Sequence, residues 1–406
     1  MSDNLYQLNP SQRYIILDSL RGLALLGICL ANFSEFSLYS FLDIDTQQAM
    51  PTAGIDTVVK YLQYIFVDGK FYTIFSLLFG IGFSIILSNA AQHNRNGIKI
   101  FYRRMLVLLL IGLLHLLCLW AGDILALYAF AGFFLPLFIG VSDRTLITWA
   151  VILLLIPIAI DAGVEFLGWN LSAPAIAATQ YFHAQFGITE ENFSVWLAES
   201  QTYLDVLKFN LAGSFIRMQE FIDGNRFFKV LGLFLLGLYI GRKGIYANLQ
   251  ENKNFIKKIM KYGLIIGLPM TMLYAWSAMN GRPLGLTMHS VIYAVSVVPL
   301  ALFYISAISL WYLKNKERNV FKVFATSGRM ALTNYLMQSV FGMIIFYGIG
   351  FRLGARIGLV YVELIAIAIF CLQIACSYLW LNYNRFGPVE WGWRMLTYGK
   401  WMRLVK

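Results

Sequence analysis

Long apolar segments separated by short polar loops run through almost the whole chain. A membrane-spanning helix needs roughly 20 apolar residues, and ten segments approach that length. The second segment is long enough to be two pieces, because Asp68, Gly69 and Lys70 interrupt it. The sixth is short and follows a stretch, 203–224, that could form an amphipathic or re-entrant helix. The ten segments are 15–34, 62–88, 102–120, 123–141, 145–167, 227–241, 262–279, 287–312, 329–350 and 357–381.

The composition also indicates an all-α, multi-pass integral membrane protein. Only 13% of the residues are charged, whereas about 25% are charged in soluble domains. The net charge is +11, and the basic residues concentrate in 93–104, 242–261, 314–322 and the C-terminal tail. The loops between these regions are acidic or nearly neutral, with Arg352 and Arg356 as the main exceptions. The positive-inside rule therefore predicts a bundle of about ten transmembrane helices with both termini cytoplasmic.

Composition and motifs exclude several classes of function. No basic run is long enough to follow a phosphate backbone, so nucleic acid is not expected as a partner. The four cysteines lie in apolar segments without the spacing of metal ligands, so no metal site is expected. Membrane lipids are expected around the bundle, and the sequence leaves a homodimer open.

The first apolar segment, LDSLRGLALLGICLANF at 17–33, carries polar residues at costly positions. On a helix, Asp18 and Arg21 are three residues apart and share a face. Asn32 follows Arg21 by eleven residues, so it lies on nearly the same face about 16 Å further along. Ionisable residues inside a membrane usually face a cavity or a partner. We therefore expect a polar stripe along this helix, although Asp18 and Arg21 could simply anchor it at the headgroups.

His115 is the histidine best placed for chemistry, in the outer half of the third segment and eight residues before Asp123. A turn after the helix could bring the Asp123 carboxylate to the imidazole, as a general base requires. Two simpler interpretations remain open. Asp123 follows a glycine and could be a helix N-cap, and His115 could be a polar contact between helices.

Five stretches together resemble the YeiB-like family of bacterial membrane proteins, which are predicted acyltransferases whose C-terminal half is a domain of unknown function. They are YIILDSLRGLALLGICLAN (14–32), KFYTIFSLLFGIG (70–82), LLHLLCLWAGDIL (113–125), SGRMALTNYLMQS (327–339) and GPVEWGWRMLTYG (387–399). The N-terminal half is also similar, more distantly, to heparan-α-glucosaminide N-acetyltransferase, which acetylates a sugar amine across a membrane with acetyl-CoA.

The resemblance implies an organisation for the chain and a location in the bacterial cytoplasmic (inner) membrane. Residues 1–167 would form an acyltransferase-like helical half. Residues 168–225 would form an outer insertion, either a plain loop cap or a lid over the acceptor. Residues 226–406 would form the YeiB-like half, ending in an amphipathic tail on the cytoplasmic side.

The resemblance also implies roles for the polar residues. In acyltransferases that share the opening motif, a catalytic histidine stands where this chain has Asn32. Asparagine cannot remove a proton, but its amide can donate a hydrogen bond to an oxyanion. We therefore expect His115 to be the base, Asp123 to orient it, and Asn32 to stabilise the tetrahedral intermediate.

The donor implied by the resemblance is acetyl-CoA or another acyl-CoA, entering from the cytoplasm. Arginines and helix-start amides suit its phosphates, and Trp391 or Trp393 of the tail could stack on its adenine. Basic residues at inner helix ends and an interfacial tail are also what the membrane alone requires. The candidate donor-binding residues are Asp18, Arg21, Arg103, Arg104, Ser327, Arg329 and Trp391.

The acceptor would be a hydroxyl or amine of a sugar, envelope glycan or lipid at the outer side. Lys70 and Arg226 could hold an anionic acceptor, or could snorkel to the membrane surface. The alternative function is a proton-coupled transporter or flippase, in which Asp18, Arg21, His115 and Asp123 would form a proton relay. We find no internal repeat of the kind from which many transporters are built.

Overall fold

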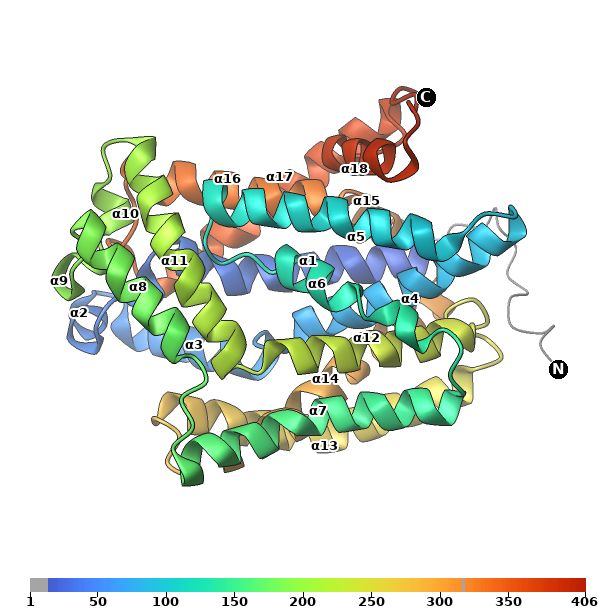
Figure 1. Cartoon of the computed structure of the whole chain (residues 1–406), viewed down its shortest axis with the longest axis horizontal. Coiled ribbons are helices and arrows are strands. Elements are labelled where there is room, and N and C mark those ends of the chain that lie inside the picture. The colour runs from blue at the N-terminus through green and yellow to red at the C-terminus, as the bar shows by residue number, and fades with distance from the viewer. Residues whose placement is uncertain (1–13, 316–317) are drawn as a thin grey trace.

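The computed structural model describes residues 14–315 and 318–406, and helices make up most of this part (Figure 1). Within it, seven helical segments are long and apolar enough to cross a membrane, so the chain is an α-helical membrane protein. The segments are α1 (Ile15–Phe36), α3 with α4 (Ala53–Phe66 and Lys70–Gln92), α5 with the π-helical turn η2 (Gly97–Leu114 and His115–Leu119), α7 (Asp143–Leu167), α13 (Lys253–Met279), α14 (Gly285–Lys314) and α17 (Leu359–Tyr383).

Three of the predicted segments form shorter helices. The 123–141 segment becomes α6 (Leu125–Gly132) and the 3-10 helix η3 (Leu135–Phe138), because Pro136 starts a new element in its middle. The short sixth segment is α12 (Arg226–Arg242), and the ninth is α16 (Ala331–Phe346). The stretch 203–224 is a helix, α11 (Tyr203–Asp223), as expected.

The predicted interruption of the second segment is confirmed between α3 and α4. Gly69 there has φ of +78°, a left-handed conformation that costs a residue with a side chain more than it costs glycine. A Cβ at this position would also lie only 2.8 Å from the Tyr293 hydroxyl. Glycine is therefore required for the chain to turn and start α4 at Lys70.

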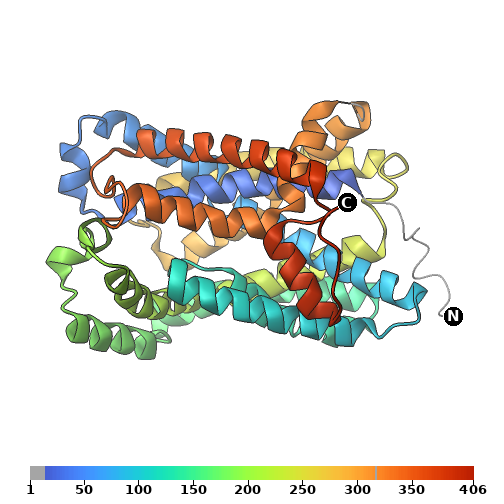
Figure 2. The ribbon, with the colours of Figure 1, turned by 90° about the horizontal axis from the view of Figure 1, so that it is seen from above.

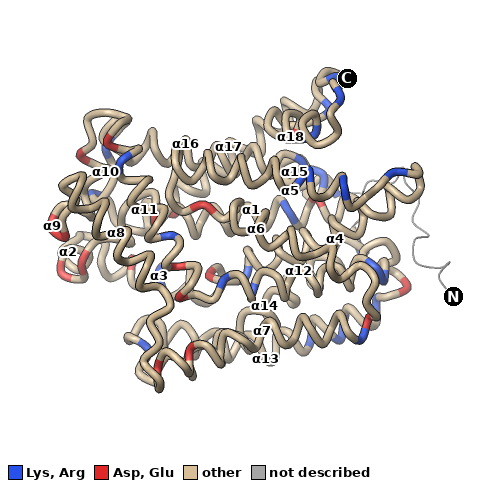
Figure 3. The backbone as a smooth tube through the Cα atoms, in the orientation of Figure 1, with Lys and Arg blue, Asp and Glu red and all other residues tan. Residues whose placement is uncertain are grey.

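The two ends of the bundle differ in charge and covering. One end is covered by α2 (Ile44–Ala49), α8 (Ala173–Phe186), α9 (Glu190–Phe193) and α10 (Trp196–Glu199), and we call it the capped end (Figure 1). The opposite end, the basic end, carries many Lys and Arg side chains (Figure 3). The helices α15 (Asn319–Arg329) and α18 (Pro388–Tyr398) lie there, and α18 packs beside the start of α5 (Figure 2).

Helix α1 lies in the centre of the bundle, packed against α4, α15, α16 and α17. Its contact with α15 depends on two glycines. A Cβ on Gly22 would overlap the Phe324 carbonyl, and a Cβ on Gly328 would overlap the Asp18 carbonyl. This close crossing brings Arg21 and Arg329 to the same level of the bundle.

Candidate functional site

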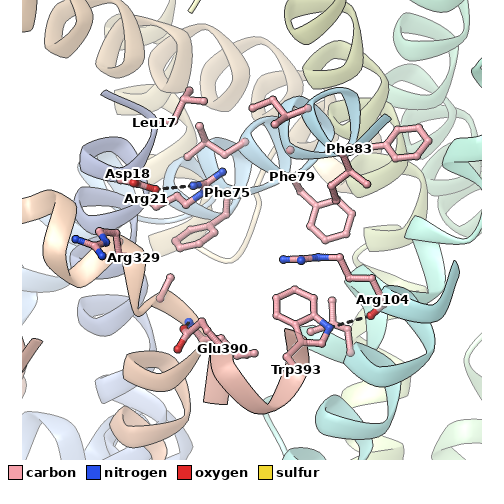
Figure 4. Close-up of a pocket in the computed structure, with 18 of the residues that line it drawn as sticks. Leu17, Asp18, Arg21, Phe75, Phe79, Phe83, Arg104, Arg329, Glu390 and Trp393 are labelled. Carbon is pink, nitrogen blue, oxygen red and sulfur yellow. Dashed lines mark hydrogen bonds and ion pairs between the residues drawn. The ribbon is translucent and has the colours of Figure 1, made fainter. Parts of the chain in front are cut away.

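A cavity of about 570 Å³ opens between α1, α4, α5, α16 and α18 (Figure 4). Its volume is in the range of small-molecule sites, roughly 300–1,000 Å³. Aromatic and aliphatic side chains line the interior, so this part of the cavity suits an apolar group of a ligand. These side chains include Leu25, Ile28, Phe75, Phe79, Phe83, Met105, Leu108 and Leu125.

The part of the cavity at the basic end is strongly cationic. Two carboxylates, Asp18 and Glu390, lie among five arginines there. Asp18 accepts a hydrogen bond from Arg21 at 2.8 Å, which confirms the expected pair on one face of α1. This excess of guanidinium groups suits a ligand with several phosphates. The arginines are Arg21, Arg104, Arg329, Arg385 and Arg394.

Arg104 and Trp393 form a cation–π stack in this cationic part (Figure 4). The Arg104 guanidinium lies 3.7 Å from the centre of the Trp393 ring, and the indole N–H donates to the Arg104 carbonyl at 3.0 Å. Trp391, the other tryptophan that could have stacked on a ligand, does not line the cavity and donates to the Met402 carbonyl. Residues two apart on a helix do not share a face, so only one of these tryptophans can line the cavity.

Glu390 joins α18 to the start of α16. Its carboxylate accepts hydrogen bonds from the backbone amides of Leu332 and Thr333, at 2.8 and 3.0 Å, and from the Thr333 hydroxyl. Burial raises the pKa of Glu390, although these hydrogen bonds oppose the shift. We expected free backbone amides at a helix start near Ser327 to bind phosphate, and this is wrong. Ser327 lies near the end of a separate helix, α15, and the first amides of the following helix, α16, already donate to Glu390. Ser327 is fully buried inside α15 and donates to the Phe324 carbonyl.

The end of the cavity at Tyr335, which we call its inner end, lies beside His115 and Asp123, the expected base and its partner. His115 begins the π-helical turn that ends α5, and the chain then folds back through Trp120 to Asp123. The Asp123 Oδ1 atom accepts from His115 Nδ1 at 2.8 Å, and Oδ2 accepts from the Ala126 amide at 2.7 Å. Both side chains are almost wholly buried. Asp123 therefore holds the imidazole and caps α6 at once.

Ser339 is the residue of this site that the sequence reasoning missed. Its hydroxyl lies 2.7 Å from His115 Nε2, on the ring side opposite Asp123. Tyr335, one turn earlier on α16, lines the cavity with its ring 5.2 Å from the His115 ring. The Tyr335 hydroxyl is buried. Both residues belong to the stretch SGRMALTNYLMQS, which resembles a motif of the family. The sequence therefore marked this stretch but did not indicate a role for Ser339 or Tyr335.

Arg217 on α11 supports the loop that carries Asp123. Its guanidinium donates to the carbonyls of Gly122 and Asp123, at 2.6 and 3.0 Å, and to Glu220 at 2.6 Å. Burial lowers the pKa of Arg217, but the nearby Glu35 and Glu220 outweigh this, and the net shift is upward. The sequence offered one hint, an arginine in an otherwise acidic insertion.

An aromatic contact covers His115 on the side of Trp120. The Trp120 ring lies 6.2 Å from the His115 ring and 4.4 Å from the Phe36 ring, measured between centres. Asn32, the expected oxyanion donor, is half-buried on α1. No hydrogen bond in the described part of the chain joins it to His115 or Asp123. Arg103 is exposed and donates to the Leu396 carbonyl, outside the cavity.

Lys70 and Arg226 lie in a second polar cluster, apart from the cavity. Lys70 is fully buried and donates to the Tyr64 carbonyl at 2.6 Å, so the expectation that it could snorkel is wrong. Arg226 lies over the Tyr72 ring, 5.0 Å from its centre. The cluster is held together by pairs such as Tyr274 with Asp68 and Asn225 with Asp161. We define it as Asp68, Lys70, Tyr72, Asp161, Asn225, Arg226, Lys229, Tyr274, His289, Ser290 and Tyr293.

Comparisons with known proteins agree with the resemblance seen in the motifs. Residues 240–400 match a family described as "Protein of unknown function (DUF418)". The chain is 30% identical to the uncharacterized protein YxaH of Bacillus subtilis, over 98% of this chain and 97% of that protein. It is 27% identical to the uncharacterized protein YeiB of Escherichia coli, over 95% of this chain and 96% of that protein. The chain therefore belongs to the YeiB-like family that YxaH and YeiB represent.

Proposed function

We propose that this protein is a membrane acyltransferase. It takes an acyl group from acyl-CoA at the cytoplasmic face and passes it to a hydroxyl or amine of a sugar, envelope glycan or lipid at the outer side. One observation carries the proposal: a cavity with an arginine-rich mouth and an apolar interior ends at Tyr335, whose ring contacts His115.

The cavity suits each part of an acyl-CoA. Its phosphates match the guanidinium groups of the cationic part, because arginine binds phosphate with paired N–H donors. The stacked Arg104 and Trp393 side chains offer the adenine a stacking partner. The narrow pantetheine arm fits the aromatic and aliphatic interior, which leads toward His115.

His115 and Asp123 supply the base. A carboxylate at Nδ1 fixes the imidazole tautomer with the proton on Nδ1 and a lone pair on Nε2. The lone pair can take a proton from a hydroxyl or amine as it attacks the thioester, and the carboxylate stabilises the imidazolium that results. This transfer needs no metal and no redox partner.

The membrane orientation follows from the charge of the two ends. We propose that α6 with η3, α12 and α16 complete about ten crossings, and that both termini and the basic end face the cytoplasm. The relatives are bacterial, which supports the bacterial inner membrane as the location. The cavity then opens on the side where acyl-CoA is made.

Binding of acetyl-CoA to the purified protein in detergent tests this function. Arg21→Ala should weaken binding about tenfold to a hundredfold, because it removes a charged phosphate partner. Arg103→Ala is the matched control, since this arginine lies outside the cavity, and it should bind like the wild type. His115→Ala should bind normally and lose transfer. Absence of binding to acetyl-, succinyl- and long-chain acyl-CoA by the wild type would contradict the proposal.

A proton-coupled transporter or flippase is the second candidate, and the second polar cluster favours it. Buried ionisable residues between α4, α7, α12 and α14 are the kind of group that forms proton pathways in membranes. Proton uptake by proteoliposomes under an imposed gradient measures this directly. Two results together would favour transport. The wild type would take up protons without binding acyl-CoA, and Asp161→Asn would abolish the uptake.

A further inference from the structure

We propose that Ser339 carries the acyl group as a covalent ester between donor and acceptor. The inference rests on the proposed acyltransferase function and names the group that His115 activates first. Ser339, His115 and Asp123 come from α16, from the π-helical turn after α5 and from the loop before α6. The fold brings them together across 224 positions of sequence.

The three side chains form a continuous chain of hydrogen bonds. The Ser339 Oγ atom lies 2.7 Å from His115 Nε2, and His115 Nδ1 lies 2.8 Å from Asp123 Oδ1. An ionised carboxylate can only accept, so Nδ1 carries the proton and Nε2 accepts from the serine hydroxyl. A hydroxyl, an imidazole and a carboxylate in this order are the arrangement that makes serine a nucleophile on unrelated folds.

Burial adds to this argument. Ser339 and Asp123 each expose 1% of their surface, and so does His115. Each hydrogen bond in such a dry site is stronger than in water, and the imidazolium formed during attack needs the carboxylate to be stable. Asp123 is held in place by the Ala126 amide and, through the loop backbone, by Arg217. The Ala126 amide and Arg217 therefore both hold Asp123 in position for its contact with His115.

Ser339 is buried next to the cavity without lining it. Tyr335 lines the inner end of the cavity, and Ser339 lies one helical turn further along the same face of α16, about 6 Å away. A thioester carbonyl at the inner end would reach Ser339 when the Tyr335 side chain turns aside.

The two half-reactions balance without a further reactant. Ser339 Oγ attacks the thioester carbon and its proton moves to His115 Nε2. The carbon–sulfur bond breaks, and the CoA thiolate leaves with the proton from Nε2. The acceptor hydroxyl or amine then attacks the serine ester and gives its proton to His115. The bond to Oγ breaks, and Oγ regains a proton from Nε2.

A covalent carrier explains how donor and acceptor can use opposite ends of the molecule. CoA can leave through the basic end before the acceptor arrives at the capped end. The two substrates therefore never need to occupy the site together, and the donor cavity can close behind the acyl group.

The inference predicts CoA release without any acceptor. Purified wild-type protein, mixed with acetyl-CoA or palmitoyl-CoA, should release about one CoA per protein in a burst and carry the acyl group on Ser339, read by peptide mass spectrometry. Ser339→Ala should show neither the burst nor the label. Ser296→Ala is the matched control, because Ser296 is equally buried but bonds only within its own helix. It should behave like the wild type.

Ser339→Cys keeps the nucleophile and guards against misfolding of the alanine variant. Its acyl group should be a thioester, which neutral hydroxylamine removes, whereas the wild-type ester resists it. Native membranes supply the acceptor for complete turnover. If Ser339→Ala transfers acyl groups to them at the wild-type rate, or if the wild type transfers without the burst and label, the serine inference is overturned and the acyltransferase function stands. If the wild type shows no release and no transfer, the proposed function fails as well.

Discussion

Asp123 uses its two carboxylate oxygens for two different partners. One holds the His115 ring, and the other caps α6 through the Ala126 amide. The two interpretations that the sequence left open, an N-cap and a partner of His115, describe the same side chain. The two roles differ in what they require, because a cap needs an acceptor oxygen whereas the support of an imidazolium needs a negative charge.

Asp123→Asn separates these roles. The amide oxygen still accepts from Ala126, so thermal stability should be close to wild type. The neutral amide no longer supports the imidazolium, and acyl transfer should fall by about 10²- to 10⁴-fold. Asp123→Ala should in addition lose about 1 kcal/mol of stability with the cap. Thermal unfolding and CoA release measure the two effects, and full activity in Asp123→Asn would leave Asp123 only a cap.

Residues close in sequence were predictable, and distant partners were not. The contact of His115 with Asp123 could be predicted because eight residues and one turn separate them. Ser339 and Arg217 reach the same place from α16 and α11, and one sequence holds no record of which helices meet. The choice between Trp391 and Trp393 could not be made from the sequence for a similar reason, since the pattern identifies an amphipathic tail but not which of its faces turns inward.

The crossing of α1 and α15 shows how two helices build the mouth of the cavity. Gly22 and Gly328 let the backbones touch, and this contact sets Arg21 of α1 beside Arg329 of α15. Hydropathy predicts the long helices well but not such crossings. It merged the end of α15 with α16 into one segment, 329–350, because the break depends on Glu390 from the distant α18.

Gly328→Ala tests the importance of this crossing. The new methyl group would meet the Asp18 carbonyl, which is backbone and cannot turn aside. We expect a loss of about 1–3 kcal/mol in stability, as for overpacked cores, together with weaker acetyl-CoA binding. Gly54→Ala is the control, since nothing lies within 4 Å of a Cβ there. Thermal unfolding and a binding titration give the result, and equal values for the two variants would refute the role of the contact.

At the scale of the whole molecule, a basic end that opens into the cavity lies opposite a capped end, to which residues 168–225 contribute α8, α9 and α10. His183 lies within that cap on α8, with its ring 5.7 Å from the Phe193 ring. Its Nε2 atom is buried without a hydrogen-bond partner in the described residues. Burial lowers the pKa of His183 from its ordinary value of 6.5, so the folded cap favours the neutral ring.

The cap should therefore loosen in acid. The contribution of neutral His183 to stability is fully present above pH 6.5 and is lost as the pH falls from there through the lowered folded value. Hydrogen exchange in α8 and α9 should quicken between about pH 7.5 and about pH 5, while α17, which contains no histidine, stays protected. His183→Gln should remove this pH dependence. Equal exchange of α8 in both variants across the range would show that another group is responsible.

In the proposed acyltransferase reaction, the contact of Trp120 with Phe36 has a consequence for the fate of the acyl group. An ester or thioester that meets water is hydrolysed. A protein that admits water at this point would therefore hydrolyse acyl-CoA, as a thioesterase does, instead of transferring the acyl group. The aromatic rings beside His115 and the burial of the ring itself keep water out. In this proposal the exclusion of water, rather than the choice of nucleophile, preserves the acyl group until its acceptor arrives.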